Sequence, residues 1–435
     1  MFQFTRLENG VRVLTEHCPG TRSVSIGSLV DASPQDDPID RRGLAHLTEH
    51  ALFQGTSARS EMEISRLMDA AGGQMGAFTT RDYTCYFANV LDDYVTFAID
   101  LLGDILCNST FPAEQMSREQ QAIVREIGLS VDSPMDRIHT SLKQSIWRDH
   151  PLGRPVHGTA EDVAKMNRED IIYFLQEHYT PDRVIVCAAG NVDHDLFVEH
   201  VQDALWMMDG SNPRKPSAPC VFHPSVNVEP SSASQSYFAI AIPAPHYTSE
   251  DRYSWFVLNT ILGGGMSSRL FRRIREEMGR AYHIDSALNS YRDAGILVIE
   301  GSTSPESLRD VLSATLLEMG KMAFGDQPID EEELWTARMQ LRGQHLLSSE
   351  NLSTRMSRLA TQEFYFGRRI DEDEVLQCIN QVTLEELQGL VDQSLPASLS
   401  RIAVAVTGAV ESKSETEATI QEIAGCFRAV ETVSS

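Results

Sequence analysis

The chain has 435 residues, which is too long for one typical domain and near the size of two. Hydrophobic residues make up 42% and charged residues 23% of the total, so the protein is globular rather than disordered or fibrous. The 37 Lys and Arg residues against 62 Asp and Glu residues give a net charge of −25, which repels nucleic acid and anionic lipid. We therefore expect neither nucleic acid nor a membrane as a partner.

Two further features predict the compartment. The N-terminus lacks the basic and apolar pattern of a leader, and no apolar run approaches the roughly 18 to 20 residues that a membrane span needs. The seven cysteines are odd in number, scattered and never arranged as Cys-x-x-Cys, which is typical of reduced thiols. We expect a cytoplasmic protein.

The first half of the chain mixes strand and helix patterns. Its elements are predicted in chain order: strands within 3–16 around an Asn9-Gly10 turn and at 23–31, a helix after the capping box Ser60–Glu63, strand residues 75–90, an apolar helical stripe from Val95 to Leu106, and a helix beginning near Pro112. Strands in runs with helices grouped between them indicate an α+β fold with largely antiparallel sheets.

The clearest break in composition lies at residues 209–219, which hold three prolines and several turn-forming residues. The second half then repeats the theme, with an alternating strand at 235–242 and a helix after the predicted capping box Thr248–Asp251. We therefore predict two similar α+β domains, each an antiparallel sheet with helices packed on it. The predicted boundaries are 1–212 for the first domain, 213–222 for the linker and 223–435 for the second domain.

The most informative stretch is His46-Leu-Thr-Glu49-His50, in which two histidines lie four residues apart. On a helix, residues i and i+4 share a face, so both imidazoles can bind one ion while Glu49 lies beside them. This order is the inverse of the His-Glu-x-x-His zinc helix. Zinc suits two imidazoles and a carboxylate with water in the fourth position, and an unligated glutamate can take the proton of that water. A third ligand is therefore required.

Candidates for the third ligand are Glu119 and Glu126, on a predicted helix over residues 112–130. Seven residues make nearly two helical turns, so the two side chains project from almost the same face. One of them can bind the metal while the other holds a ligand in place. The remaining histidines, among them His139, His157 and His283, have no second ligand at metal-binding spacing, and we expect most of them on the surface or at helix caps.

Several stretches together resemble the pitrilysin-type zinc metallopeptidases, and the resemblance covers nearly the whole chain. It points to the single-unit subfamily that includes bacterial processing proteases and the β subunit of the mitochondrial processing peptidase. The stretches are Gly43–Thr56, the Glu119/Glu126 pair, Gly158–Asp162, His178–Pro181 and Gly263–Phe271. The resemblance implies the fold of that family and a zinc-dependent endopeptidase that cuts unfolded peptides or short targeting segments.

The resemblance also implies roles for individual residues. His46, His50 and Glu126 match the zinc ligands, Glu49 matches the general base that activates the metal-bound water, and Glu119 matches a glutamate that supports the site. The second half has no His-x-x-Glu-His sequence, so we expect one Zn²⁺ per chain.

Two further groups match regions that contact the substrate in the family. Gly76, Ala77, Phe78 and Thr79 occupy the place where a peptide adds as a strand to a sheet edge, although the family usually has asparagine at the position of Gly76. In the second half, Arg275 and Tyr282 match a pair that faces the zinc from an opposing half and that can stabilise an oxyanion.

In single-unit members the Arg/Tyr pair comes from a second subunit. The implied active form is therefore a homodimer, or a heterodimer with a similar chain. The alternative is a non-catalytic subunit that binds peptide or acts as a scaffold in a heterodimeric peptidase. The intact His46, Glu49, His50 and Glu126 favour the enzyme.

Overall fold

The computed structural model describes residues 1–410 and 412–434 and divides the chain into two compact units. Unit 1 contains residues 1–128, 154–217 and 346–369, and unit 2 contains residues 129–153, 218–345 and the chain from 370 onward. The contiguous domains predicted from the sequence differ from these units in two segments. Residues 129–153 belong to unit 2, and residues 346–369 belong to unit 1.

The sheet of unit 1 has its described strands in the order β1-β2-β6-β3-β5-β4. Strands β2 and β6 are parallel, and the other neighbouring pairs are antiparallel. The predicted hairpin at the N-terminus is present, with Phe2 opposite Glu16 and Gly10 at a φ of 107° in the turn. The strands are β1 (Phe2–Arg6), β2 (Arg12–His17), β3 (Ser23–Val30), β4 (Gln74–Thr79), β5 (Thr84–Leu91) and β6 (Val184–Gly190).

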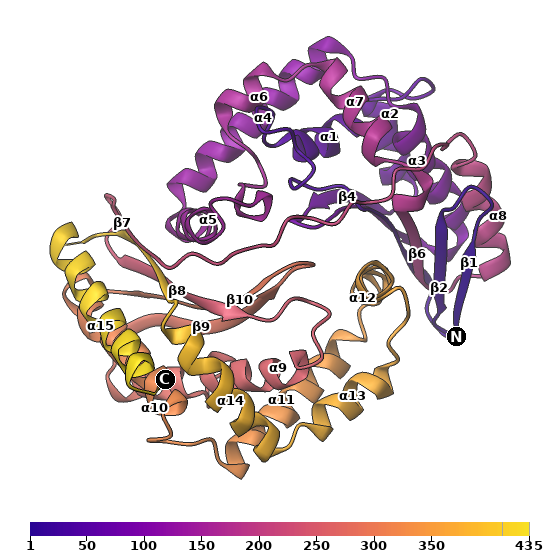
Figure 1. Cartoon of the computed structure of the whole chain (residues 1–435). Helices are drawn as coiled ribbons and strands as arrows, with labels where there is room; N and C mark the ends of the chain where they lie inside the picture. The colour runs from indigo at the N-terminus through magenta and orange to yellow at the C-terminus, as the bar shows by residue number, and fades with distance from the viewer. Residues whose placement is uncertain (411, 435) are drawn as a thin grey trace. The chain divides into compact units, whose positions relative to one another are not determined.

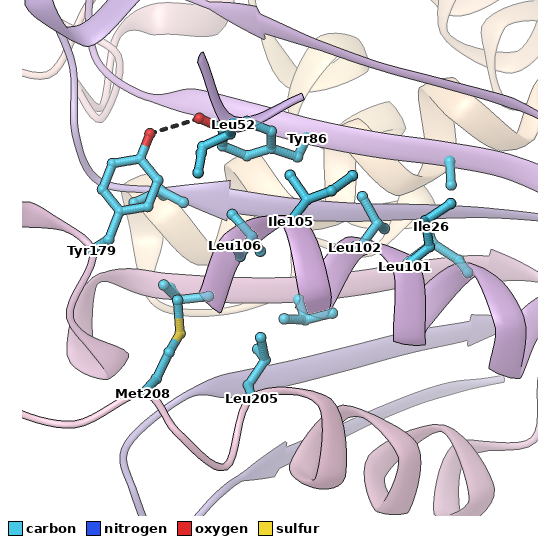
Figure 2. Packing of buried hydrophobic residues seen from close by; sticks show 14 of the residues in the cluster. Ile26, Leu52, Tyr86, Leu101, Leu102, Ile105, Leu106, Tyr179, Leu205 and Met208 are labelled. Atoms are coloured by element: carbon cyan, nitrogen blue, oxygen red, sulfur yellow. Dashed lines mark hydrogen bonds between the residues drawn. The ribbon is translucent and has the colours of Figure 1, made fainter. Parts of the chain in front are cut away.

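Helices cover one face of this sheet (Figure 1). The apolar stripe predicted for residues 95–106 lies on α3, and Leu101, Leu102 and Ile105 are buried against the sheet (Figure 2). Tyr86 of β5 adds a hydrogen bond of 2.7 Å to the hydroxyl of Tyr179 within this core. The helices of unit 1 are α1 (Leu44–Leu52), α2 (Glu61–Ala70), α3 (Val95–Asn108), α4 (Ala113–Asp132, which continues into unit 2), α6 (Ala160–Lys165), α7 (Arg168–His178), α8 (His194–Ala204) and α12 (Leu352–Phe366).

The opposite face of the same sheet is covered by α12, which is far away in the sequence. Leu14 and Leu29 point to this face and pack with Met356 and Leu359. A Cβ atom on Gly27 of β3 would overlap the sulfur of Met356, so the absence of a side chain there lets the helix lie close to the sheet. The sheet is thus apolar on both faces because both faces are buried.

The sheet of unit 2 has its described strands in the order β7-β11-β8-β10-β9, with β7 and β11 parallel and the other neighbours antiparallel. The strands are β7 (Ser225–Pro230), β8 (Ser236–Ala244), β9 (Ala281–Ser290), β10 (Gly295–Thr303) and β11 (Ala403–Gly408). The helices are α5 (Pro134–Ile146), α9 (Arg252–Gly263), α10 (Leu308–Ala323), α11 (Glu331–Ser348, which ends in unit 1), α13 (Glu372–Gln381), α14 (Leu384–Leu399) and α15 (Lys413–Ser434). Both units therefore have the predicted α+β architecture.

Helix α5 does for unit 2 what α12 does for unit 1. Its residues Ile138, Leu142 and Ile146 pack on the sheet face formed by small and branched residues such as Ala239 and Val298. The sequence pattern breaks at residues 209–219. The compact units, however, also depend on which sheet α5 and α12 pack against. No helix within residues 1–410 and 412–434 is long and apolar enough to cross a membrane.

One local prediction in this unit is wrong. Helix α9 begins at Arg252, one residue after the predicted capping box, and Asp251 makes no side-chain capping hydrogen bond. The hydroxyl of Thr248 lies 3.1 Å from Nδ1 of His246 instead. By contrast, the predicted capping box at Ser60 and Glu63 is formed at the start of α2.

The packing of α12 predicts a strong effect of one methionine. Met356 is buried, so Met356→Ala leaves a cavity against the sheet and should lower the free energy of unfolding by about 2–5 kcal/mol. Met62 lies in the same unit and is 71% exposed, so Met62→Ala should change it by less than about 0.5 kcal/mol. Urea denaturation of both variants measures the difference. Equal effects would show that α12 does not stabilise the sheet.

Candidate metal centre

A buried aspartate binds the start of the helix that contains the two histidines. Both oxygens of the Asp37 carboxylate accept backbone hydrogen bonds at the start of α1, from Gly43 at 2.7 Å and from Ala45 at 2.8 Å. Burial raises the pKa of Asp37 to about 8, although the two backbone donors act in the opposite direction. Asp37 thus satisfies two of the amide groups that a helix N-terminus leaves unpaired.

Two glycines fix where this helix lies. Gly43 has a φ of 94° and Gly158 a φ of 71°, in the left-handed region that favours glycine. A Cβ on Gly43 would lie 2.5 Å from the carbonyl oxygen of His157, and a Cβ on Gly158 would overlap the carbonyl oxygen of Arg42. The loop at residues 157–158 therefore lies directly against the first turn of α1, with no side chain between the two backbones.

Three predicted ligands converge in unit 1. Nε2 of His46 and Nε2 of His50 lie 4.0 Å and 3.9 Å from Oε2 of Glu126. The candidate ligand atoms of these residues all lie within 4.8 Å of one another. Helix α1 provides both histidines, and α4 provides the carboxylate. The structure thus brings together the two histidines selected by their spacing and the glutamate that the family resemblance implies as the third ligand.

Helix α4 is held in register with the site by both apolar and polar contacts. Its Met116 and Ile123 are buried in the core of unit 1. The side-chain amide of Gln120 donates hydrogen bonds of 2.8 Å to the carbonyl oxygens of Val163 and Met166. Glu119 accepts a hydrogen bond of 2.9 Å from Nδ1 of His50, a contact of the kind that orients a metal-binding imidazole. Its role as a supporting glutamate stays a prediction.

The electrostatics of the two histidines differ. Burial, together with the charges of His50 and His157, lowers the pKa of His46 to about 3, so His46 stays neutral and keeps a lone pair for a metal. Burial also lowers the pKa of His50, but the hydrogen bond to Glu119 and the charges of Glu49, Glu119 and Glu126 outweigh it and raise the pKa. An acidic environment of this kind attracts a cation.

The donor set fits zinc. Two imidazoles and one carboxylate form a three-ligand zinc site with an open fourth position. Tetrahedral ligands at 2.0–2.1 Å from zinc lie roughly 3.4 Å apart, so spacings of 3.9 and 4.0 Å need only a small inward movement. The side chain of Glu126 is 41% exposed and can provide that movement.

Glu49, the predicted general base, lies on the same helix and is 7% exposed. Its Oε2 accepts a hydrogen bond of 2.5 Å from the hydroxyl of Thr79, the last residue of β4. Burial raises the pKa of Glu49, and the bond from Thr79 and the charge of His50 oppose this effect. The sequence marked Thr79 only as a substrate contact, and its contact with Glu49 came from the structure.

Strand β4 forms an edge of the sheet among the described strands, with β5 as its neighbour. It contains the predicted substrate-binding residues Gly76, Ala77, Phe78 and Thr79. The Phe78 side chain is 38% exposed. An edge strand presents unpaired backbone groups that another extended chain can bind.

The two predicted residues of the second half lie in unit 2. Arg275 is on a π-helical turn, η4 (Phe271–Glu277), with its guanidinium carbon 5.0 Å from the centre of the Phe271 ring. Tyr282 is at the start of β9 and is 60% exposed. Their contact with a metal centre remains a prediction.

Sequence analysis missed one residue at this site. His157 was expected on the surface or at a helix cap, but its ring centre lies 4.5 Å from that of His46. Nδ1 of His157 lies 3.7 Å from Oε1 of Glu126. The sequence signal nearest to it was Gly158, because a glycine can mark a place where two backbones lie close together.

A second group of possible ligands occurs in unit 2, formed by His283, Asp285 and Glu300. Nε2 of His283 lies 3.2 Å from Asp285, and Nε2 of His139 lies 2.6 Å from Glu300. Two members of this group, His283 and Asp285, are thus already in direct contact with each other, and the third, Glu300, is in contact with His139, which is outside the group. In the first group the ligand atoms face one another across about 4 Å, which leaves space for an ion.

Models of known protein families match both parts of the chain. Residues 12–160 match the family described as Insulinase (Peptidase family M16), and residues 165–341 match the Peptidase M16 inactive domain. The matches place the chain in a class of proteins in which a domain of the M16 peptidase family is followed by an M16 inactive domain.

Individual proteins of similar sequence support the same family. A Mycobacterium leprae protein named uncharacterized zinc protease is 36% identical, over 94% of this chain and 92% of its own length. A Bacillus subtilis protein of the same description is 34% identical, over 89% and 94%. The chain therefore belongs to peptidase family M16.

Two solved structures show the same fold. A peptidase M16 inactive domain from Pseudomonas fluorescens has a TM-score of 0.88 at 17% identity, covering 95% of this chain and 98% of the other. A protease from Helicobacter pylori has a TM-score of 0.84 at 17% identity, covering 94% and 99%.

The contact between the two glycines predicts the effect of a single methyl group. Gly158→Ala combines a left-handed φ with overlap on the Arg42 backbone, whereas Gly72→Ala has a similar φ of 63° and open space around it. We expect Gly72→Ala to cost about 1–2 kcal/mol of stability and Gly158→Ala a further 1–3 kcal/mol or more. Urea denaturation gives both values. Equal losses would show that the loop does not hold α1.

Proposed function

We propose that this protein is a zinc-dependent endopeptidase. The observation that carries the proposal is the convergence of His46, His50 and Glu126, with the buried Glu49 beside them on the same helix. Membership of a peptidase family whose relatives are named zinc proteases supports it. The finer relation to single-unit processing proteases is part of this proposal.

The residues divide the chemistry among them. Zinc held by the three ligands would lower the pKa of water and polarise the peptide carbonyl. Thr79 donates to Oε2 of Glu49, which leaves Oε1 to accept the proton of the attacking water. Glu49 then transfers that proton to the nitrogen of the leaving amine. Burial favours proton uptake at Glu49 because it raises the pKa of the carboxyl group.

We infer that the substrate is an extended peptide. A peptide that adds to β4 as a further strand would bind backbone to backbone along Gly76–Thr79 and bring its scissile bond next to Glu49, which Thr79 contacts. Folded proteins do not offer such a free strand, so unfolded peptides or short targeting segments are the proposed substrates. The exposed ring of Phe78 would contact a substrate side chain.

We further propose that the active form contains two similar chains, with Arg275 and Tyr282 of one facing the metal of the other and stabilising the oxyanion. A reducing, cytoplasmic location is consistent with the cysteines whose side chains the structure describes, all six of which are unpaired. The physiological partner is either a second copy or a related chain.

The first test separates metal binding from turnover. Glu49→Gln keeps all three ligands but removes the base, so it should retain one zinc per chain and lose at least about 100-fold in cleavage rate. His50→Ala removes a ligand and should lose both zinc and activity. Mass spectrometry of cuts in a mixture of unfolded peptides, with and without a chelator, measures cleavage, and elemental analysis measures zinc.

A zinc-loaded wild-type protein that cuts no peptide would favour the alternative, a peptide-binding or scaffold subunit. Cleavage by Glu49→Gln at the wild-type rate would remove Glu49 from the mechanism. Glu61→Gln is the matched control, because Glu61 is an exposed glutamate in the first turn of α2, and its loss should leave both readouts unchanged.

The second test addresses the composite site. Glu49→Gln and Arg275→Ala chains should each be inactive alone. If Arg275 acts on a partner's metal, a mixture of the two should recover roughly a quarter of the wild-type rate, because half of the dimers are mixed and each has one intact site. No recovery from a mixture that demonstrably exchanges subunits would show that the two residues do not act across a homodimer.

A further inference from the structure

The two oxygens of Glu126 face different partners. Oε2 is directed at the ligand nitrogens of His46 and His50, at 4.0 Å and 3.9 Å. Oε1 is directed at Nδ1 of His157, at 3.7 Å. A carboxylate arranged in this way binds a metal through one oxygen if something retains the other.

His157 has a fixed position. Its peptide lies against the first turn of α1 because neither Gly43 nor Gly158 has a side chain, and a Cβ on either would overlap backbone atoms. Its ring contacts that of His46 edge to face, with an angle of 78° between the planes. Nδ1 of His157 is buried and has no hydrogen-bond partner within the part of the chain that the structure describes. Glu126 is thus the nearest acceptor shown for this buried nitrogen.

His157 is placed behind the ligands rather than among them. The group of converging ligand atoms contains His46, His50 and Glu126, and His157 is not a member of it. Its position relative to Glu126 corresponds to that of Glu119 relative to His50, where a second side chain orients the ligand. Partners of this kind hold ligand groups in the orientation that a metal requires.

We propose that His157 is a positioning residue for the metal centre: with its proton on Nδ1, it retains Oε1 of Glu126 and so keeps Oε2 directed at the two histidines. The inference rests on the proposed function, because it presumes the metal site. The present distance must shorten by roughly 0.7–0.8 Å to reach an ordinary N–H···O hydrogen bond, and bonds at such sites tighten when the site is loaded.

The role matters because Glu126 is the most exposed of the three ligands. Its side chain is 41% exposed, against 7% for His46 and 26% for His50. An exposed glutamate loses rotamer freedom when it binds a metal, and a partner that limits this freedom beforehand strengthens binding. The expected gain is about 10–100-fold in metal affinity.

Zinc affinity of the purified full-length protein tests the proposal, measured by competition with a chromophoric chelator. His157→Phe keeps a ring against His46 but removes the donor, so affinity should fall about 10–100-fold. His157→Asn places an amide N–H near the former Nδ1 and should restore most of that loss. The Co²⁺ absorption spectrum reports the ligand geometry independently of activity and should change in His157→Phe.

Two variants serve as references. Glu119→Gln should weaken binding because it alters a contact at 2.9 Å, and His17→Phe should not, because His17 is in β2 and contacts the carbonyl of Val192. Circular dichroism of the metal-free proteins verifies the fold of each variant. If His157→Phe binds zinc as tightly as the wild type, or if His157→Asn fails to improve on it, the positioning role is wrong.

The two proposals fail in different ways. A wild-type protein that binds zinc but cuts nothing contradicts the peptidase function and leaves the affinity comparison valid. A wild-type protein that binds no zinc contradicts both. Normal cleavage together with unchanged affinity in His157→Phe contradicts the positioning role alone.

Discussion

The metal centre depends on a contact between two backbones. Gly43 opens α1, and Gly158 lies against it with no side chain in between, while Asp37 binds the first free amides of the helix. This contact fixes both the start and the direction of α1, so it also fixes the face on which His46 and His50 point at α4. The predicted metal ligands are therefore positioned by groups that do not bind the metal themselves.

Burial then shapes how each group titrates. His46 has almost no contact with water, which keeps it neutral, whereas Glu119 favours the protonated form of His50. Glu49 is also buried, and the Thr79 hydroxyl limits how far its pKa rises. A site that combines a neutral imidazole, an acid-supported imidazole and a partly exposed carboxylate can release the proton of His50 and take up a divalent cation.

Sequence periodicity was sufficient for the local features of the fold and for part of the site. The stripe on α3 and the histidine pair on α1 are set by contacts within a few residues, so spacing alone predicts them. Other features depend on segments far apart in the chain. Helix α5 packs in unit 2 and α12 in unit 1, each away from its neighbours in the sequence. This packing, the contact of Thr79 with Glu49 and the place of His157 arise where distant strands and loops meet, and no spacing within one segment encodes them.

The late position of α12 in the sequence affects how the chain folds during synthesis. The sheet of unit 1 needs α12 to cover the face that bears Leu14, Leu29 and Ile185, and the segment that includes α12 ends at residue 369. All strands of that sheet leave the ribosome well before this helix. The growing chain thus exposes an apolar sheet face while residues 191–351 are synthesised, a state in which nascent proteins aggregate or recruit chaperones. Burial of that face and completion of the second sheet must occur late and close together in time.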